Sequence, residues 1–325
     1  MLNPTRGLTA LLSMITACAA HAAATEKPVE APGPAGPLRG MMLSPATPAA
    51  PLALIIPGSG PTDRDGNNLR GIRAGTYKLL AQELAAQGIA SVRIDKRGMF
   101  TSAAATPDAN DVTIADYASD VHSWVATLRQ STGAACVWLI GHSEGALVAM
   151  ASAEDREGIC GLVLVAGAGR PLADVLREQL RANPANGPLL EQAMPVIDAL
   201  EHGRRVDTSA LHPALQGLFA PQVQKFLIST FAYNPRQMLA AYPKPVLIVQ
   251  GLRDIQVSEA DAHLLQQAAP HASLVLLPDV NHVLKTVKSA DRAANLATYT
   301  DPVLPLAPGA ASAIADFIHR NARAD

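Results

Sequence analysis

A serine stands at the centre of the pattern Gly-His-Ser-Glu-Gly, which occupies residues 141–145. The apolar run 137–140 comes directly before it, and the helix-forming run 146–150 follows. A G-x-S-x-G pattern between a strand and a helix is typical of a sharp turn that exposes the serine hydroxyl as a nucleophile. The two glycines let the strand and the helix pass each other closely. We therefore predict that Ser143 is a catalytic nucleophile.

A serine hydroxyl is a good nucleophile only beside a base that takes its proton. The chain has nine histidines, and His282 follows the apolar run 274–277, which we predict to be a strand. It should lie at the carboxyl edge of a parallel sheet, where the serine turn also emerges. His142 is expected to point away from the serine, and the other histidines fall in helical or connecting stretches. We predict His282 as the base.

An acidic residue must orient this base and stabilise its cationic form. Asp254 follows the predicted strand 246–249, so it should lie at the same edge of the sheet. Asp279 is a weaker candidate, because it is close to His282 on one loop and is explained equally well as a turn residue. Asp261 is expected at an exposed position of a helix. We predict Asp254 as the acid.

An acyl-transfer site also needs two N–H groups that bind the oxyanion. The backbone N–H of Glu144, directly after the serine, is the first candidate. The second is the backbone N–H of Ser59, in the turn 57–61 that ends the apolar run 52–56. A tight turn without a chemical role would have the same two glycines, and the two interpretations are compatible.

Apolar runs alternate with helical patterns through most of the chain, which predicts an α/β fold with a mostly parallel sheet flanked by helices. The alternation breaks between residues 170 and 242, where several short helices interrupted by prolines are expected; we predict a helical lid there. The predicted organisation is a signal peptide at 1–24, a linker at 25–37, core segments at 38–169 and 243–325, and the lid at 170–242. The predicted strands cover residues 38–43, 52–56, 89–95, 137–140, 162–165, 246–249 and 274–277, and the longer predicted helices cover 77–87, 116–130 and 310–319.

Composition narrows the classes of partner. Of the 325 residues, 49% are apolar and 17% are charged, so a large core is expected. The net charge of −2 and the aromatic content of 4% argue against nucleic-acid binding. No cluster of residues has the spacing of metal ligands. We predict a small-molecule substrate, no metal, no cofactor and no membrane span after the first residues.

The first residues predict export. Arg6 precedes the apolar run 8–20, which is too short to span a bilayer, and residues 20–22 have the small-x-small pattern of a signal-peptidase site. We expect a periplasmic or secreted protein. An alternative is that residues 15–18 form a lipobox, in which case Cys18 would carry a lipid anchor.

Export removes one of the three cysteines and leaves Cys136 and Cys160 in an oxidising compartment. Each begins one of two neighbouring parallel strands, which lie about 5 Å apart. This distance is within the reach of a disulfide. We therefore predict a Cys136–Cys160 bridge, with two buried thiols as the alternative.

Two charged segments have open interpretations. Residues 63–65, Asp-Arg-Asp, line the substrate pocket or form a self-paired loop near the oxyanion turn; the same alternatives hold for Lys96 and Arg97. Glu144 either makes a hydrogen bond at the start of the predicted lid or stabilises the N-terminus of its helix through the macrodipole.

With these residues in place, the chain resembles α/β-hydrolases of the bacterial secreted carboxylesterase group, which is related to serine-aminopeptidase-like hydrolases. The resemblance spans residues 38 to 320, and the order of serine, acid and base is that of α/β-hydrolase triads. It implies an α/β-hydrolase fold and a cofactor-free carboxylic ester hydrolase acting on short acyl chains. The region before Leu38 is short for this group, so the leading strands are expected to be incomplete. The motifs that carry the resemblance lie at residues 57–67, 95–98, 141–145, 251–254 and 281–282.

Two other classes of function use the same motifs. An exported aminopeptidase-like enzyme would need a carboxylate for the substrate ammonium group, for which Glu191 and Glu201 in the predicted lid are candidates. A non-catalytic binding protein on the same scaffold commonly lacks one triad residue, and here none is missing. The sequence leaves the natural substrate and the oligomeric state open.

Overall fold

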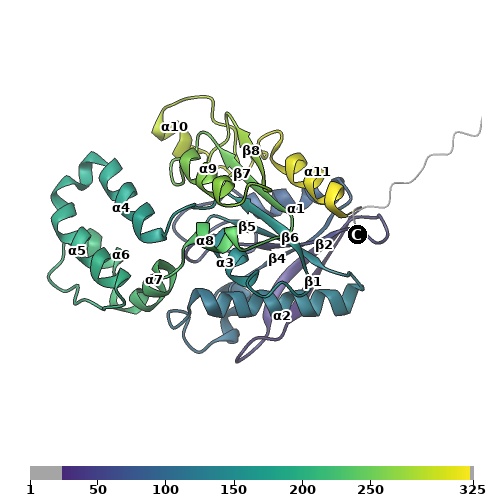
Figure 1. Ribbon diagram of the computed structural model, residues 1–325, viewed down its shortest axis with the longest axis horizontal. Coiled ribbons are helices and arrows are strands. Elements are labelled where there is room, and N and C mark those ends of the chain that lie inside the picture. Colours follow the sequence, from purple (N-terminus) through teal and green to yellow (C-terminus); the bar gives the residue numbers. More distant parts are fainter. Residues whose placement is uncertain (1–23, 323–325) are drawn as a thin grey trace, which may run out of the picture.

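The computed structural model of the chain describes residues 24–322, and eight strands form one sheet in the order β1-β2-β4-β3-β5-β6-β7-β8 (Figure 1). From β4 to β8 all neighbouring strands are parallel, whereas β2 is antiparallel to β4, and β1 is antiparallel to β2. The predicted α/β-hydrolase architecture is confirmed. The strands are β1 (Thr25–Ala31), β2 (Leu38–Ser44), β3 (Leu52–Ile56), β4 (Ala90–Ile94), β5 (Val137–His142), β6 (Ile159–Val165), β7 (Val246–Gly251) and β8 (Ser273–Leu277).

Helices cover both faces of the sheet, which is why the central strands are apolar along their whole length. Helices α2, α3 and α9 bury one face, and α1 and α11 bury the other. Every residue of β3, β4 and β5 is buried. The helices of the core are α1 (Thr76–Ala86), η1 (Phe100–Ala105), α2 (Ile114–Thr132), α3 (Glu144–Ser152), α9 (Glu259–Ala268), α10 (Arg292–Ala297) and α11 (Ala310–Ala322).

The prediction of a linker over residues 25–37 is wrong for its first part. Thr25–Ala31 forms the edge strand β1 and pairs with β2 along its whole length. Its mostly exposed sequence, with a proline at position 28, has no apolar alternation, because an edge strand needs neither two buried faces nor every N–H group. Strands β1 and β2 together extend the sheet beyond β4, so the expectation of incomplete leading strands is also wrong.

Between β6 and β7 the chain forms a group of short helices; α4, α5 and α6 stand apart from the sheet, whereas α8 lies beside α3 (Figure 1). We call residues 170–242 the helical insertion. It has an apolar core of its own, in which Ile197 and Phe219 are fully buried. Its helices are α4 (Leu172–Ala182), η2 (Pro184–Leu189), α5 (Leu190–Glu201), α6 (Pro213–Leu218), η3 (Pro221–Val223), α7 (Gln224–Phe231) and α8 (Pro235–Ala240).

A buried ion pair fixes the start of the insertion to the core. Arg170 donates two hydrogen bonds to the carboxylate of Asp261, at 2.9 and 2.8 Å. Asp261 is fully buried, which corrects the expectation of an exposed helix position. Burial raises the pKa of the Asp261 carboxyl, but hydrogen bonds from Arg170 and Ser258 outweigh it and leave the pKa below its usual value.

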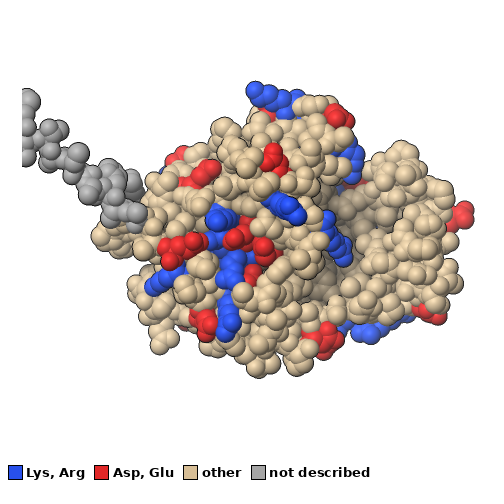
Figure 2. Space-filling model, turned by 180° about the vertical axis from the view of Figure 1, so that it is seen from behind, with Lys and Arg blue, Asp and Glu red and all other residues tan. Residues whose placement is uncertain are grey.

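The insertion follows β6, so it leaves the sheet at the carboxyl ends of the parallel strands. Figure 2 shows the surface hollowed between the insertion, on the right, and the sheet with its helices. Substrates of open α/β sheets bind at this edge. The fold therefore places a cleft where the predicted site residues follow their strands.

The predicted signal peptide, apart from residue 24, lies outside the described residues, as does Cys18. Within residues 24–322, none of the helices has the length and apolarity needed to cross a membrane.

Cys136 and Cys160 form a disulfide at the amino ends of β5 and β6. The bond closes a loop across a sequence separation of 24 residues, which contains the nucleophile turn and α3. It therefore ties together the two strands that flank this turn, at the edge of the sheet away from the site.

We expect the double variant Cys136→Ser/Cys160→Ser to fold with lower stability than the wild type. Loss of a cross-link that closes a loop of this length costs about 3 kcal/mol in the chain-entropy model. Urea unfolding would measure the change, and reduction of the wild type should reproduce it. Alkylation of both cysteines in the native, unreduced protein, detected by peptide mass mapping, would contradict the bridge.

Candidate active site

The backbone at Ser143 has φ 55° and ψ −121°, a conformation that non-glycine residues rarely adopt. Two close approaches maintain it. A Cβ atom on Gly141 would lie 2.2 Å from the carbonyl oxygen of Gly145, and a Cβ on Gly145 would lie 2.2 Å from that of Ile56. The two glycines of the pattern are therefore required by the crossing of β5, α3 and the end of β3.

The structure brings the predicted acid and base together. Asp254 follows β7 and His282 follows β8, and His282 Nδ1 lies 2.7 Å from Asp254 Oδ2. Their side chains are 1% and 5% exposed. The other carboxylate oxygen of Asp254 accepts hydrogen bonds from the backbone N–H groups of Gln256 and Val257, at 2.7 and 3.0 Å. Asp254 is thus held to face the imidazole.

Burial raises the pKa of the Asp254 carboxyl, but the neighbouring His282 and the two backbone N–H groups together bring it below its usual value. An ionised Asp254 accepts the hydrogen bond from Nδ1–H of His282. Because Nδ1 carries the proton in the neutral ring, Nε2 is left as the basic nitrogen. Asp279, the weaker candidate for the acid, instead lies 3.7 Å from Arg253 and is half exposed.

The turn 57–61 lies against Ser143. A Cβ atom on Gly58 would be 3.2 Å from Cβ of Ser143, so only glycine fits there without displacement. Within residues 24–322, the N–H groups of Ser59 and Glu144 donate no hydrogen bond, whereas the N–H of Gly58 is bound by Tyr77 Oη at 2.9 Å. The two predicted donors are therefore free to bind a ligand oxygen.

His142 contacts the base, a role that the sequence analysis missed. Its Nε2 lies 2.8 Å from the carbonyl oxygen of His282, and its Nδ1 lies 2.9 Å from Tyr77 Oη. A carbonyl only accepts, so Nε2 carries the proton, and the tyrosine hydroxyl donates to Nδ1. A chain of hydrogen bonds thus joins the N–H of Gly58, through Tyr77 and His142, to the backbone of His282.

This chain requires a neutral His142. Burial, with a smaller contribution from the neighbouring His282, lowers the pKa of His142 from 6.5 to about 3. Burial also raises the pKa of the Tyr77 hydroxyl, which remains a donor. The sequence shows that His142 is a polar residue within the turn, but no local pattern indicates that it contacts Tyr77.

The charged segments are paired with each other. Asp63 accepts hydrogen bonds from backbone N–H groups of its own loop, Arg64 pairs with Asp95 at 2.9 Å, and Asp65 pairs with Arg93. The contacts are structural, as one of the two interpretations expects, but only Asp63 is paired within its own loop, whereas Arg64 and Asp65 are paired with β4 and the residue after it. The carbonyl of Asp65 also accepts from the first N–H groups of α1, the helix that carries Tyr77.

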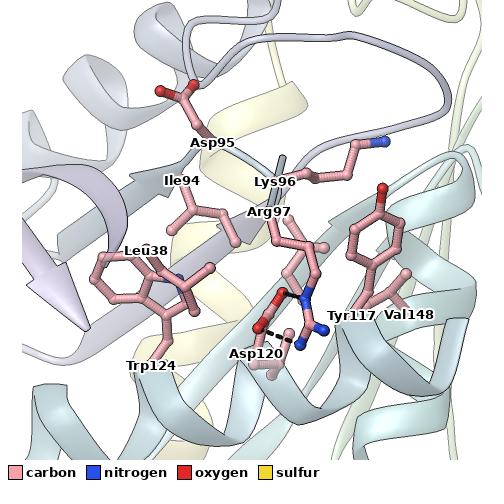
Figure 3. A pocket seen from close by; sticks show the side chains of 11 residues that line it. Leu38, Ile94, Asp95, Lys96, Arg97, Tyr117, Asp120, Trp124 and Val148 are labelled. Carbon is pink, nitrogen blue, oxygen red and sulfur yellow. Dashed lines mark hydrogen bonds and ion pairs between the residues drawn. The ribbon is translucent and has the colours of Figure 1, made fainter. Parts of the chain in front are cut away.

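The three residues that follow β4 point in three directions (Figure 3). Asp95 binds Arg64, Lys96 turns toward the nucleophile turn, and Arg97 forms two hydrogen bonds of 2.7 and 2.6 Å with the buried carboxylate of Asp120 on α2. The cavity beside them has a volume of about 10 Å³, which holds no more than a water molecule. These residues therefore hold elements together.

Residues 70–286 match the model of the family described as serine aminopeptidase, S33. This match covers more than half of the chain, which therefore belongs to this family of α/β-hydrolases. The chain is also similar to esterase EstD of Thermotoga maritima, with 27% identity over 241 residues, 72% of this chain and 54% of EstD. It thus spans about half the length of this curated relative.

Two solved structures show the same fold at low sequence identity. Est1E from Butyrivibrio proteoclasticus has a TM-score of 0.56 at 18% identity, covering 91% of this chain and 99% of its own. The esterase Pf2001 from Pyrococcus furiosus has a TM-score of 0.58 at 15% identity, covering 98% and 97%.

The low pKa of His142 predicts a loss of stability in acid. The unfolded chain binds a proton on this residue near pH 6.5, while the folded state resists it down to about pH 3. Lowering the pH through this window therefore favours unfolding, and above pH 6.5 the residue contributes no pH dependence. The wild type should lose stability faster than His142→Gln, by up to about 1.4 kcal/mol per pH unit.

Urea unfolding of both proteins between pH 7.5 and 4.5 would measure this difference. The titratable groups around His142 are the phenol of Tyr77, the imidazole of His282 and the carboxylate of Asp254. All three remain in His142→Gln. The exposed His271 offers a matched control, because His271→Gln should follow the wild-type curve. Parallel curves for the wild type and His142→Gln would show that His142 does not resist protonation.

Proposed function

We propose that this protein is a serine carboxylic ester hydrolase that acts through an acyl-enzyme, with Ser143, His282 and Asp254 as its catalytic triad. The observation that carries the proposal is the buried 2.7 Å pair of His282 and Asp254 at the sheet edge where the strained Ser143 turn emerges. An imidazole oriented by a carboxylate, at the sheet edge where a partly exposed serine emerges, is the arrangement that would activate the serine for acyl transfer.

In the proposed reaction, Nε2 of His282 takes the proton of Ser143 while Oγ attacks the ester carbonyl. The N–H groups of Ser59 and Glu144 bind the developing oxyanion. The protonated His282 then donates its proton to the leaving alcohol, which departs and leaves an acyl-serine. Water repeats the sequence and releases the carboxylic acid. Asp254 stabilises the imidazolium form of His282 in both steps.

The names of the relatives and the position of the insertion support this assignment. EstD and Pf2001 are each called an esterase. We further propose that the helical insertion acts as the lid of the cleft, that the substrates carry short acyl chains, and that no cofactor takes part. The Cys136–Cys160 disulfide favours an exported protein, because such bonds persist in oxidising compartments.

The family description favours one competing function, an aminopeptidase. Such an enzyme would need a free carboxylate for the substrate ammonium group. Of the two candidates in the insertion, Glu201 forms an ion pair with Arg177 at 2.5 Å, and Glu191 is an exposed residue of α5. An ester substrate needs no such group, so the esterase is the function that the site supports best.

Hydrolysis of a p-nitrophenyl butyrate ester and an aminoacyl p-nitroanilide should separate the two functions. We expect turnover of the ester alone, its loss to below a few per cent in Ser143→Ala, and no change in the exposed-serine control Ser209→Ala. Turnover of the anilide would assign a peptidase instead. If the wild type hydrolyses neither substrate, a binding protein on this scaffold would be favoured.

The two candidate acids give a second test. Asp254→Asn should lower kcat by at least about 100-fold, because the imidazole loses the group that sets its tautomer and stabilises its cation. Asp279→Asn, on the loop that carries His282, should retain near wild-type kcat. Circular dichroism would check that both variants are folded. The opposite ranking of the two variants would reassign the acid to Asp279.

A further inference from the structure

Lys96 is a buried cation beside the nucleophile turn, with a side chain only 4% exposed. Its ammonium group donates a hydrogen bond to the carbonyl oxygen of Gly58 at 2.7 Å. It also lies 3.3 Å from a carboxylate oxygen of Glu144, and 5.3 Å from the centre of the Tyr117 ring. A buried lysine is costly unless it is paired, and these contacts supply the pairing.

Two of these partners belong to the groups that supply the proposed oxyanion donors: Gly58 shares a peptide bond with Ser59, and Glu144 supplies its own N–H. No peptide bond among the described residues is cis, so the carbonyl of Gly58 and the N–H of Ser59 point to opposite sides of one trans peptide. A cation bound to this carbonyl therefore sits behind the N–H that faces the ligand. Glu144 supplies the other N–H, and its carboxylate is held by the same cation.

We propose that Lys96 is a positioning residue that aligns and strengthens the oxyanion hole through the Gly58–Ser59 peptide and Glu144. A charge-assisted hydrogen bond to a carbonyl oxygen polarises the peptide, which makes its N–H a stronger donor. The same bond fixes the tilt of the peptide, so the N–H needs no reorientation when the oxyanion forms. The proposal rests on the proposed function, since it assigns a role in that reaction.

The geometry argues against direct contact between Lys96 and the substrate. An ammonium group has three donors. One binds the Gly58 carbonyl, one faces Glu144, and the ring of Tyr117 lies on a further side, as Figure 3 shows for the lysine and the tyrosine. Lys96 therefore acts through the backbone that it holds.

The other side of the same turn is also fixed. The N–H of Gly58 binds Tyr77 Oη, whose hydroxyl binds His142. Gly58 is thus held at its N–H by the chain of hydrogen bonds that leads to His282, and at its carbonyl by Lys96. Removing Lys96 frees the carbonyl side alone, which leaves the triad in place.

The test compares Lys96→Met, which keeps the unbranched apolar part of the side chain without its charge, with Lys78→Met at an exposed position. We expect Lys96→Met to lower kcat for the butyrate ester by about 10- to 100-fold, less than complete loss of an oxyanion donor, with KM changed less than about threefold. The apparent pKa of the kcat–pH profile should not move, because the His282–Asp254 pair is untouched. Lys78→Met should match the wild type.

A trifluoromethyl ketone with a propyl group gives a readout that a purely structural role would not move. Ser143 Oγ adds to its carbonyl carbon, the serine proton goes to His282, and the carbonyl oxygen becomes an oxyanion in the hole. The inhibition constant should rise in Lys96→Met by the same factor as kcat/KM falls. An unchanged inhibition constant would overturn the proposal. So would a fall in kcat/KM that comes from a rise in KM with kcat unchanged.

Glu144→Ala covers the case in which Lys96→Met fails to fold. It removes one anchor of the ammonium group and should give a smaller decrease in kcat with weaker ketone binding; unchanged kcat and ketone binding would overturn the proposal.

If the double variant folds, its effect should be less than the product of the single effects, since both act through one contact. A wild type without ester turnover overturns the proposed function and this proposal together, whereas an active wild type with an unaffected Lys96→Met overturns this proposal alone.

Discussion

Close packing at the turn around Ser143 is the constraint on which the rest of the site depends. Strand β5, helix α3 and the end of β3 cross so tightly that Gly145 touches the carbonyl of Ile56 and Gly58 touches Ser143. Because β3 and β5 are parallel neighbours, the chain leaving β3 must run directly beside the serine. The strained backbone and the oxyanion turn are therefore two results of one packing arrangement.

The polar groups buried behind this turn are paired with one another. Tyr77 and His142 connect the turn 57–61 to the backbone of His282, and Lys96 connects the same turn to Glu144. Buried polar groups are tolerated only when they are hydrogen-bonded, so these residues form a network in which each depends on the others. The site is consequently supported from several helices and strands rather than by its loops alone.

Charged residues farther from the nucleophile serve the same support. The pairs Arg64–Asp95 and Arg97–Asp120 join the loops after β3 and β4 to each other and to α2. The pair Arg170–Asp261 fixes the start of the helical insertion. The insertion has an apolar core of its own, but Leu239 and Tyr242 near its end belong to the core of the sheet, and α8 packs against α3.

The sequence by itself determined the strands from residue 38 onward, the nucleophile turn and the family, because these depend on local patterns: apolar runs, glycines at fixed spacing, and polar residues directly after strands. It failed at β1, where an edge strand has no apolar alternation, and at Asp261, whose burial follows from a partner 91 residues away. Only the tertiary structure paired His142 with Tyr77 and His282, and Lys96 with Gly58 and Glu144. These contacts join residues 38 to 140 positions apart, and no local pattern encodes a partner at such distances.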